Sequence, residues 1–216
     1  MRTIDKGTEP RYLRNYRRKD GCNYHDFDEK DKLRSALVKE QRRLCCYCMC
    51  RIHEDNGDVK IEHWKSQSRY PEDQLDYNNL LAACKGGKGK RYKDQHCDTR
   101  KDQDDLKWNP AKLNHHIETH LYYDGDGTIW SDDNEFDGQI NKVLNLNLAR
   151  LCNNRKRLFD ETYRWWKSEV SQSDGWVARI RLERKRERFI NGTNDLIPYC
   201  QVAIYFLDQK ISELQL

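Results

Sequence analysis

The sequence predicts an α+β protein with a small metal-stabilised core of short strands, flanking helices, and mostly helices in the rest of the chain. Three observations support this fold class. Four cysteines lie between positions 45 and 50, and two more follow at positions 84 and 97. The segment VKIEHW at 59–64 alternates in polarity, as a half-buried strand does. Apolar residues recur at helical spacing both before and after it.

Composition limits the function classes. Of the 216 residues, 35% are charged and 36% are hydrophobic, so the core is thin and the surface is dense with charge. The net charge of +4 is only weak support for a nucleic-acid partner, although basic residues cluster in separate stretches. No apolar run approaches the roughly 20 residues that span a membrane, and the N-terminus lacks the apolar segment of a secretory signal. We therefore expect a cytoplasmic protein without membrane contact, where clustered cysteines more often bind metal than form disulfides.

The chain divides into three parts. We expect residues 1–28 to form a basic N-terminal arm that lies on the surface or on a partner. Residues 29–110 are expected to form the core with its structural zinc. Residues 111–216 are expected to form a β-hairpin and a helical region whose amphipathic faces suit docking onto a partner.

Polarity patterns and turn residues define the elements of the core. In chain order they are a helix at 29–44, a turn at 53–58 with an Asn-Gly pair, a strand at 59–64, a second short strand or tight loop at 77–84, a flexible basic loop at 85–95 and a helix or a loop entering one from 96. The same patterns define the later elements. They are two strands around a glycine turn at 116–130, a helical segment at 139–170, a very basic helix at 176–190 and a final amphipathic helix at 196–214.

Cysteine spacing predicts a structural zinc site. Cys45 and Cys48 form a C-x-x-C pair, whose spacing lets one short loop present two thiolates to one tetrahedral Zn²⁺. Cys84 and Cys97 are the nearest candidates for the second half of the site. A closed site of four thiolates leaves no open coordination position, so it would stabilise the fold rather than catalyse a reaction. The alternative is a set of reduced, buried thiols. Three residues stay open as substitute ligands: Cys46, Cys50 and His96.

Four polar residues inside this frame suit phosphodiester hydrolysis: Glu62, His63, Asn79 and Asp98. A neutral imidazole suits the base that deprotonates a water, and carboxylates suit Mg²⁺. Adjacent side chains on a strand point to opposite faces, so Glu62 and His63 can share one site only at a strand end or bend. Each residue also has a plainer interpretation, as a surface polar pair, a turn cap or a helix cap.

Residues 44–101 resemble the HNH endonucleases, whose fold is called ββα-metal. The resemblance rests on the segments CCYC, IEHW, YNNLLAAC and HCDTRK. The longer segments EQRRLCCYC and IEHWKSQS, with the glycine-lysine loop that follows, are similar to one branch of the family. That branch is the HNH subunit of Septu and retron-associated anti-phage defence systems. The resemblance is strong over 40–101 and loose elsewhere.

The resemblance implies a role for each site residue. His63 would be the general base, and Asn79 would orient the loop that presents it. Glu62 and Asp98 would bind a catalytic Mg²⁺ or another divalent cation, while the four cysteines hold zinc. Many members of the family have Asp where Glu62 stands and Asn where Asp98 stands. A carboxylate at position 98 should bind a cation at least as well, at the cost of more negative charge near the scissile phosphate.

The resemblance also implies partners. The substrate would be DNA or RNA, and a partner ATPase would bind the nuclease and control it. In retron-associated members, a reverse transcriptase with its RNA–DNA complex would be a further partner. Six basic residues near the site are expected to contact phosphates: Lys85, Lys88, Lys90, Arg91, Lys93 and Lys101. Two alternatives remain: an RNA substrate, including transfer RNA, or a non-catalytic zinc-stabilised module that binds nucleic acid or a partner.

Overall fold

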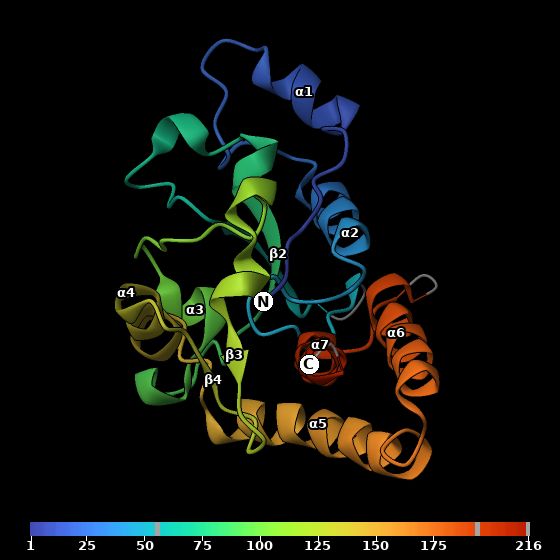
Figure 1. The fold of residues 1–216 in the computed structure, drawn as a ribbon. Helices are drawn as coiled ribbons and strands as arrows, with labels where there is room; N and C mark the ends of the chain where they lie inside the picture. Colours follow the sequence, from blue (N-terminus) through green and yellow to red (C-terminus); the bar gives the residue numbers. More distant parts are fainter. Residues whose placement is uncertain (55–56, 193–194, 215–216) are drawn as a thin grey trace.

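The computed structural model describes residues 1–54, 57–192 and 195–214, which combine helices with two small antiparallel sheets (Figure 1). Helix α2 (Lys30–Glu40) confirms the helix expected at 29–44. It ends early because Arg42 and Arg43 adopt φ angles of 52° and 60°, which turn the chain into the cysteine-rich segment. The Asn-Gly turn expected at 53–58 includes residues 55 and 56, which lie outside the described residues.

The N-terminal segment is not the arm that the sequence predicts. It contains helix α1 (Arg11–Arg17), and the backbone N–H of Ile4 donates to the carbonyl of Pro110 at 2.8 Å. Four of its apolar side chains are buried in the main hydrophobic core: Met1, Ile4, Leu13 and Phe27. The expectation rested on the many basic residues, but widely spaced apolar side chains suffice to fix the segment when they pack against residues far along the chain.

Two short strands carry the candidate site. β1 (Val59–His63) and β2 (Leu80–Cys84) pair antiparallel, with His63 opposite Leu80, and both strands were among the expected elements. Helix α3 (Cys97–Lys101) follows and packs against β2. Short 3₁₀ helices lie in the connections: η2 (Pro71–Asp73), η3 (Tyr77–Asn79) and η4 (Tyr92–Asp94).

The C-terminal half is mostly helical, as expected. The second hairpin pairs β3 (Tyr122–Tyr123) with β4 (Ile129–Trp130). The helical stretch expected at 139–170 is interrupted at 144–148, where Asn145 has a φ of 50°. Two 3₁₀ helices precede the hairpin, and a π-helix lies among the α-helices that follow. These elements are η5 (Leu113–His115), η6 (Ile117–His120), α4 (Asn134–Gly138), the π-helix η7 (Gln139–Val143), α5 (Ala149–Glu169), α6 (Gly175–Asn191) and α7 (Cys200–Glu213).

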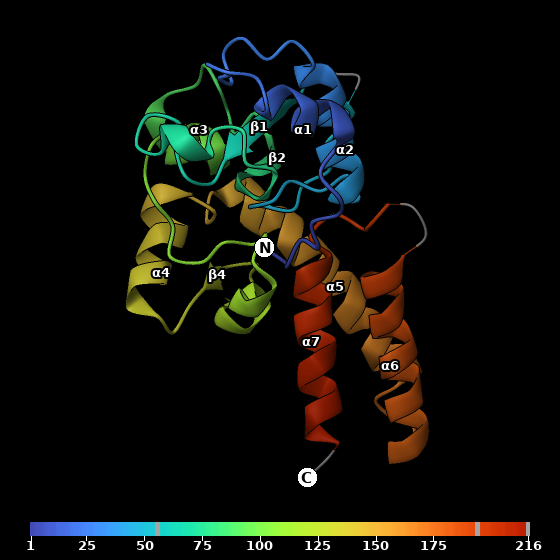
Figure 2. The same cartoon turned by 90° about the horizontal axis from the view of Figure 1, so that it is seen from above.

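The buried residues form two hydrophobic clusters. The larger one joins α2, the β1–β2 hairpin, the N-terminal segment and the second hairpin. The smaller one lies among α5, α6 and α7, and it also takes in Leu44 and Met49 from the cysteine-rich segment. Figure 2 shows α6 and α7 side by side, extending away from the hairpin that carries the site. The cysteine-rich segment therefore lies between the two clusters.

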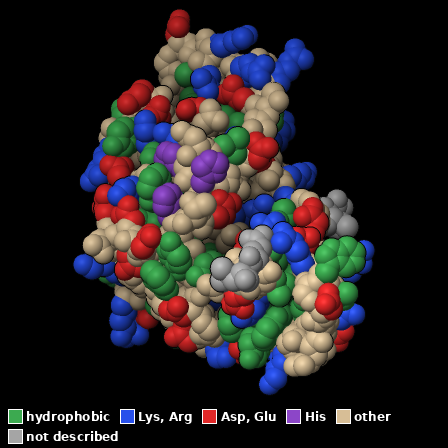
Figure 3. Space-filling view, viewed as in Figure 1, with side chains coloured by type: hydrophobic (Ala, Val, Ile, Leu, Met, Phe, Trp, Pro, Cys, Tyr) green, Lys and Arg blue, Asp and Glu red, His purple; other side chains and the backbone are tan. Residues whose placement is uncertain are grey.

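The surface matches the composition. Acidic and basic side chains are interspersed over the face shown in Figure 3. Within 1–54, 57–192 and 195–214, every helix is too short or too polar to cross a lipid bilayer.

Candidate functional site

A tight loop between Leu44 and Arg51, called here the cysteine loop, presents the first pair of thiols. A β-bridge joins Leu44 to Arg51 at its base. Inside it, the N–H of Cys45 donates to the carbonyl of Cys50 at 3.0 Å, and the N–H of Met49 donates to the carbonyl of Cys45 at 3.1 Å. Met49 has a φ of 62°, which reverses the chain within a few residues. These contacts bring the side chains of Cys45 and Cys48 to the same side.

The second pair of thiols comes from the end of β2 and the start of α3. Cys84 and Cys97 are separated by the glycine-lysine loop, which closes on itself where the N–H of His96 donates to the carbonyl of Gly86 at 2.8 Å. Gly86 has a φ of 53°, and a Cβ atom there would lie 1.9 Å from the carbonyl oxygen of His96. Only glycine allows this close approach. The loop therefore returns Cys97 to Cys84 despite the long spacing in sequence.

The four thiols that the sequence predicts as ligands converge. The sulfurs of Cys45, Cys48, Cys84 and Cys97 all lie within 4.8 Å of one another, and all four residues are buried. The Cys45 and Cys97 sulfurs are 3.9 Å apart, and those of Cys48 and Cys84 are 3.8 Å apart. A zinc ion with Zn–S distances of about 2.3 Å requires tetrahedron edges of about 3.8 Å. The four-thiol cluster therefore has the size that holds zinc.

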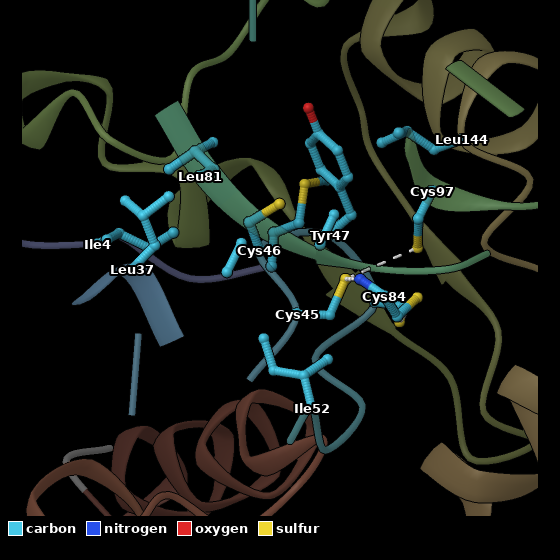
Figure 4. Packing of buried hydrophobic residues seen from close by; sticks show 14 of the residues in the cluster. Ile4, Leu37, Cys45, Cys46, Tyr47, Ile52, Leu81, Cys84, Cys97 and Leu144 are labelled. Carbon is cyan, nitrogen blue, oxygen red and sulfur yellow. Dashed lines mark hydrogen bonds between the residues drawn. The ribbon is translucent and has the colours of Figure 1, made fainter. Parts of the chain in front are cut away.

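The substitute ligands lie outside this set of four. Figure 4 shows the sulfur of Cys46 turned away from those of Cys45, Cys84 and Cys97. His96 lies beside the cluster, with its Nδ1 atom 3.1 Å from the sulfur of Cys97. Cys50 is not among the four converging sulfurs, and the neighbouring thiols of Cys45, Cys48 and Cys84, together with burial, raise its pKa.

His63, at the end of β1, is held as a neutral ring. It is 6% exposed, and its Nε2 atom lies 2.9 Å from the carbonyl oxygen of Gln74. A carbonyl only accepts hydrogen bonds, so Nε2 carries the proton and Nδ1 is left with its lone pair. That Nδ1 atom is 3.3 Å from the side-chain nitrogen of Gln67, and the edge of the Tyr24 ring contacts the imidazole. Burial lowers the pKa of His63 to about 4, so the ring is neutral at neutral pH.

Glu62 is buried and has two direct partners. The hydroxyl of Tyr47 donates to its Oε1 atom at 2.7 Å, and the ammonium of Lys101 lies 3.0 Å from the same oxygen. Burial and the neighbouring carboxyl group of Asp98 raise the pKa of Glu62 well above its ordinary value, while the charge of Lys101 opposes that rise. The two carboxyl groups predicted as metal ligands line the same cavity.

Asp98 completes the group of polar residues around one cavity. It lies at the start of α3, and its carboxylate is ion-paired with Lys60 of β1. A cavity of about 500 Å³ is lined by side chains from β1, the following loop, the glycine-lysine loop and α3. Its lining includes Lys60, Glu62, His63, Gln67, Lys88 and Asp98. The geometry thus places an imidazole and two carboxyl groups at one hollow in the surface.

Asn79, the fourth predicted residue, fastens the loop that follows His63. Its side-chain oxygen accepts from the N–H of Lys65 at 2.7 Å. Its amide nitrogen donates to the carbonyls of Lys65 and Asp73, both at 3.0 Å. Because Asp73 precedes Gln74, these bonds also position the carbonyl that holds the ring of His63.

No family model matches the chain. It is 32% identical over 62 residues to the Septu protein PtuB of Bacillus thuringiensis, a match that covers 29% of this chain and 24% of the relative. It is 29% identical over 99 residues to a retron Ec83 putative HNH endonuclease of Escherichia coli, covering 40% of this chain and 38% of the relative. The chain resembles an HNH nuclease. Each match spans less than two fifths of the relative's own length.

The basic residues expected at this HNH-like site divide into two groups. Five of them are exposed on or beside the glycine-lysine loop: Lys85, Lys88, Lys90, Arg91 and Lys93. Lys101 is different, because it is 0% exposed. Its ammonium is engaged by Glu62 and donates to the carbonyl of His63 at 3.2 Å. The prediction that Lys101 contacts nucleic acid is therefore wrong, because it faces inward from α3 toward the strand end.

Several residues of this HNH-like site were not predicted. Tyr47 and Lys60 bind the two carboxylates, while Tyr24, Gln67 and Gln74 surround the ring of His63. Tyr47 lies inside the CCYC segment, so its position between two cysteines of the predicted metal site could have marked it. Tyr24 lies far from His63 in sequence, Gln74 contributes a backbone carbonyl, and Gln67 follows His63 by four residues in an irregular loop, so no sequence pattern signals these contacts.

Proposed function

We propose that this chain is a metal-dependent HNH endonuclease that hydrolyses phosphodiester bonds in nucleic acid, built on a ββα-metal core formed by β1, β2 and α3. The observation that supports this most directly is the arrangement of His63. Its Nε2 proton is committed to the carbonyl of Gln74, and its Nδ1 lone pair, which the Gln67 amide contacts and which water can take over, lies beside the cavity that Glu62 and Asp98 also line. A neutral, oriented imidazole next to two carboxyl groups suits water activation.

The residues of the chain have distinct roles in this reaction. Nδ1 of His63 takes a proton from a water molecule, which attacks phosphorus in line with the leaving 3′ oxygen. Gln74 and Asn79 keep the imidazole in the orientation that this transfer requires. Tyr47 and Lys101 fix one carboxylate oxygen of Glu62, so that the second oxygen is available to a divalent cation. A divalent cation, when bound, supplies a Lewis acid for the charge that develops on the phosphate.

The donor set fits a hard cation. Magnesium is commonly held by one or two carboxylates while it keeps several waters, and Glu62 and Asp98 offer that number of protein ligands. The ion pair between Lys60 and Asp98 must open for Asp98 to bind the metal. Lys60 would then be free to face the phosphate. Mg²⁺ or another divalent cation is therefore proposed for this cavity, and Zn²⁺ for the four thiols.

Contact with the nucleic acid is proposed for the glycine-lysine loop. Lys88 lines the same cavity as His63, and the neighbouring basic residues are exposed. Cations on a loop grip phosphates without reading the sequence, which gives affinity that falls with salt. Both DNA and RNA offer this backbone, so the nuclease test includes both substrates.

A partner ATPase is proposed for the C-terminal helices, in a cytoplasmic anti-phage defence complex. Trp176 is 72% exposed and Val177 is 39% exposed at the start of α6. A large exposed aromatic residue is typical of a protein interface. Trp176→Ala should abolish co-purification with the ATPase and leave cleavage by the isolated chain unchanged. Unaltered co-purification would remove α6 from the interface.

A second function, a non-catalytic zinc-stabilised binding module, is favoured by one observation. Both carboxyl groups already have lysine partners, Lys101 on Glu62 and Lys60 on Asp98. Internal ion pairs of this kind can be purely structural. In that case the chain would bind nucleic acid or a partner through its basic loop and would not cleave.

One experiment separates the two functions. Supercoiled plasmid and structured RNA are incubated with the purified chain in Mg²⁺, in Mn²⁺ and in EDTA. We expect cleavage that depends on the divalent cation and is lost in His63→Ala, whereas His53→Ala, at an exposed position, cleaves like wild type. Metal content and melting temperature of each variant establish that it is folded. Cleavage by His63→Ala at the wild-type rate, or binding without cleavage in wild type, would reject the nuclease.

A further inference from the structure

His96 lies beside the four-thiol cluster without belonging to it, and both of its ring nitrogens are engaged. It is only 2% exposed and precedes Cys97 at the start of α3. Its Nδ1 atom is 3.1 Å from the sulfur of Cys97. Its Nε2 atom is 2.6 Å from a guanidinium nitrogen of Arg150, in the first turn of α5. The side chain therefore links a proposed zinc ligand to the C-terminal helices.

The partners of His96 determine where its proton lies. A guanidinium has only donors, so Nε2 of His96 must accept from Arg150. In the neutral ring the proton then sits on Nδ1, which points at Cys97. A sulfur accepts a hydrogen bond best as the thiolate, and the thiolate is the form that binds zinc. The contact with His96 therefore fixes the direction in which the Cys97 sulfur points.

The backbone at Cys97 also depends on its neighbours. Cys97 has a φ of 55°, in the left-handed region that residues other than glycine seldom adopt. Its N–H donates to the carbonyl of Leu144 at 2.9 Å, and the N–H of His96 is held by Gly86. Contacts on both sides thus keep Cys97 in an otherwise unfavourable conformation, and Asp98 follows it directly on α3.

We propose that Arg150 and His96 form a hydrogen-bonded relay that orients the sulfur of Cys97, so that α5 controls how tightly the chain holds zinc. The relay extends the proposed zinc site and depends on it. His96 and Arg150 are positioning residues here, because neither binds the ion. Second-layer hydrogen bonds of this kind commonly change metal affinity by about 10- to 100-fold.

Zinc affinity is the measurement that tests the relay. The protein, comprising all 216 residues, is loaded with Zn²⁺, and the ion is competed away with a chromogenic chelator well below the melting temperature. We expect Arg150→Met and His96→Phe to weaken zinc affinity by about 10- to 100-fold. The matched control is Arg157→Met, on the same helix and also exposed, which should keep wild-type affinity. Since Arg150 is exposed, its variant should fold even if His96→Phe does not.

A spectroscopic readout separates the relay from a general loss of stability. In the Co²⁺-substituted protein, the sulfur-to-metal charge-transfer band reports the electron density on the thiolates. We expect it to shift in His96→Phe and Arg150→Met, and to return toward wild type in His96→Asn, whose amide can still donate to Cys97. Equal zinc affinity in wild type and Arg150→Met would overturn the relay, as would an equal loss in Arg157→Met. A wild-type protein that binds no zinc would instead reject the zinc site itself.

Discussion

The ammonium of Lys101 lies 3.0 Å from the Oε1 atom of Glu62, and both side chains are almost completely buried. This ion pair joins α3 to the end of β1, and Lys101 also donates to the carbonyl of His63. A charge at this depth is stable only with its partner, because desolvation is repaid by the opposite charge and by hydrogen bonds. Lys101 is therefore part of the interior that supports the site.

Removing Lys101 should destabilise the protein strongly. Lys101→Met leaves Glu62 buried without its cation, and we expect a loss of about 3–5 kcal/mol in the free energy of unfolding. Urea denaturation measures it, with Lys88→Met as the exposed control, which should change stability by less than about 0.5 kcal/mol. Combining Lys101→Met with Glu62→Gln should recover part of the loss. If Lys101→Met is as stable as wild type and only loses nucleic-acid affinity, the stabilising role assigned to buried Lys101 is wrong.

The pKa of His63 predicts how stability depends on pH. Burial lowers it to about 4, below the ordinary value of 6.5, so the folded state resists protonation that the unfolded state accepts. The contribution of the neutral His63 ring to the free energy of unfolding is complete above pH 6.5. It is lost as pH falls toward 4, and the total loss is at most about 3 kcal/mol. The difference in unfolding free energy between wild type and His63→Gln, measured without divalent cations at several pH values, isolates this residue. A difference that stays constant from pH 7 to pH 4 would show that His63 titrates normally.

The four converging cysteines were predictable because metal coordination imposes a short-range spacing rule. The C-x-x-C pair at Cys45 and Cys48 is visible in sequence, and Cys84 and Cys97 were the nearest thiols available. The first strand was also predictable from local sequence, because the alternation of polar and apolar residues in VKIEHW does not depend on the partner strand. In contrast, the relay from Arg150 to Cys97 joins positions more than fifty residues apart, and no local pattern encodes it.

The failures also have physical causes. A basic side chain in a loop sequence is most often solvated, so Lys101 was assigned to the surface; the buried carboxylate that neutralises it lies on another element. The N-terminal segment was assigned to the surface for its charge, although Met1 and Leu13 are buried. In both cases tertiary packing decided the outcome, and a single sequence does not report packing between distant segments.

The two neighbouring cysteines of the cysteine loop make a matched pair for testing zinc. Cys45 belongs to the four-thiol cluster, whereas the sulfur of Cys46 turns away from it. We expect Cys45→Ser to lose bound zinc and to lower the melting temperature by about 10 °C or more, because zinc binding contributes directly to folding. Cys46→Ser should retain one zinc per chain by elemental analysis. Loss of zinc in both variants, or in neither, would contradict the proposed ligand set.

A substitution at Asn79 should misalign His63, the proposed general base, without changing His63 itself. Its three side-chain hydrogen bonds to Lys65 and Asp73 hold the loop whose Gln74 carbonyl orients His63. We expect Asn79→Ala to lower the free energy of unfolding by about 2 kcal/mol, because buried backbone groups lose their partners. The rate constant for cleavage should fall while the KM for nucleic acid stays near wild type, since the imidazole is misaligned but the basic loop is intact.

The neighbouring residue Asn78 is exposed and supplies the control for this prediction. Asn78→Ala removes a side chain of the same chemistry from the same short helix, and it should leave both stability and cleavage close to wild type. Kinetics are measured under saturating divalent cation, so that weakened metal binding does not mimic a slower step. A rise in KM with an unchanged rate constant in Asn79→Ala would place Asn79 in substrate binding, because an alignment role acts on the proton transfer and leaves the encounter with the phosphate backbone unaffected.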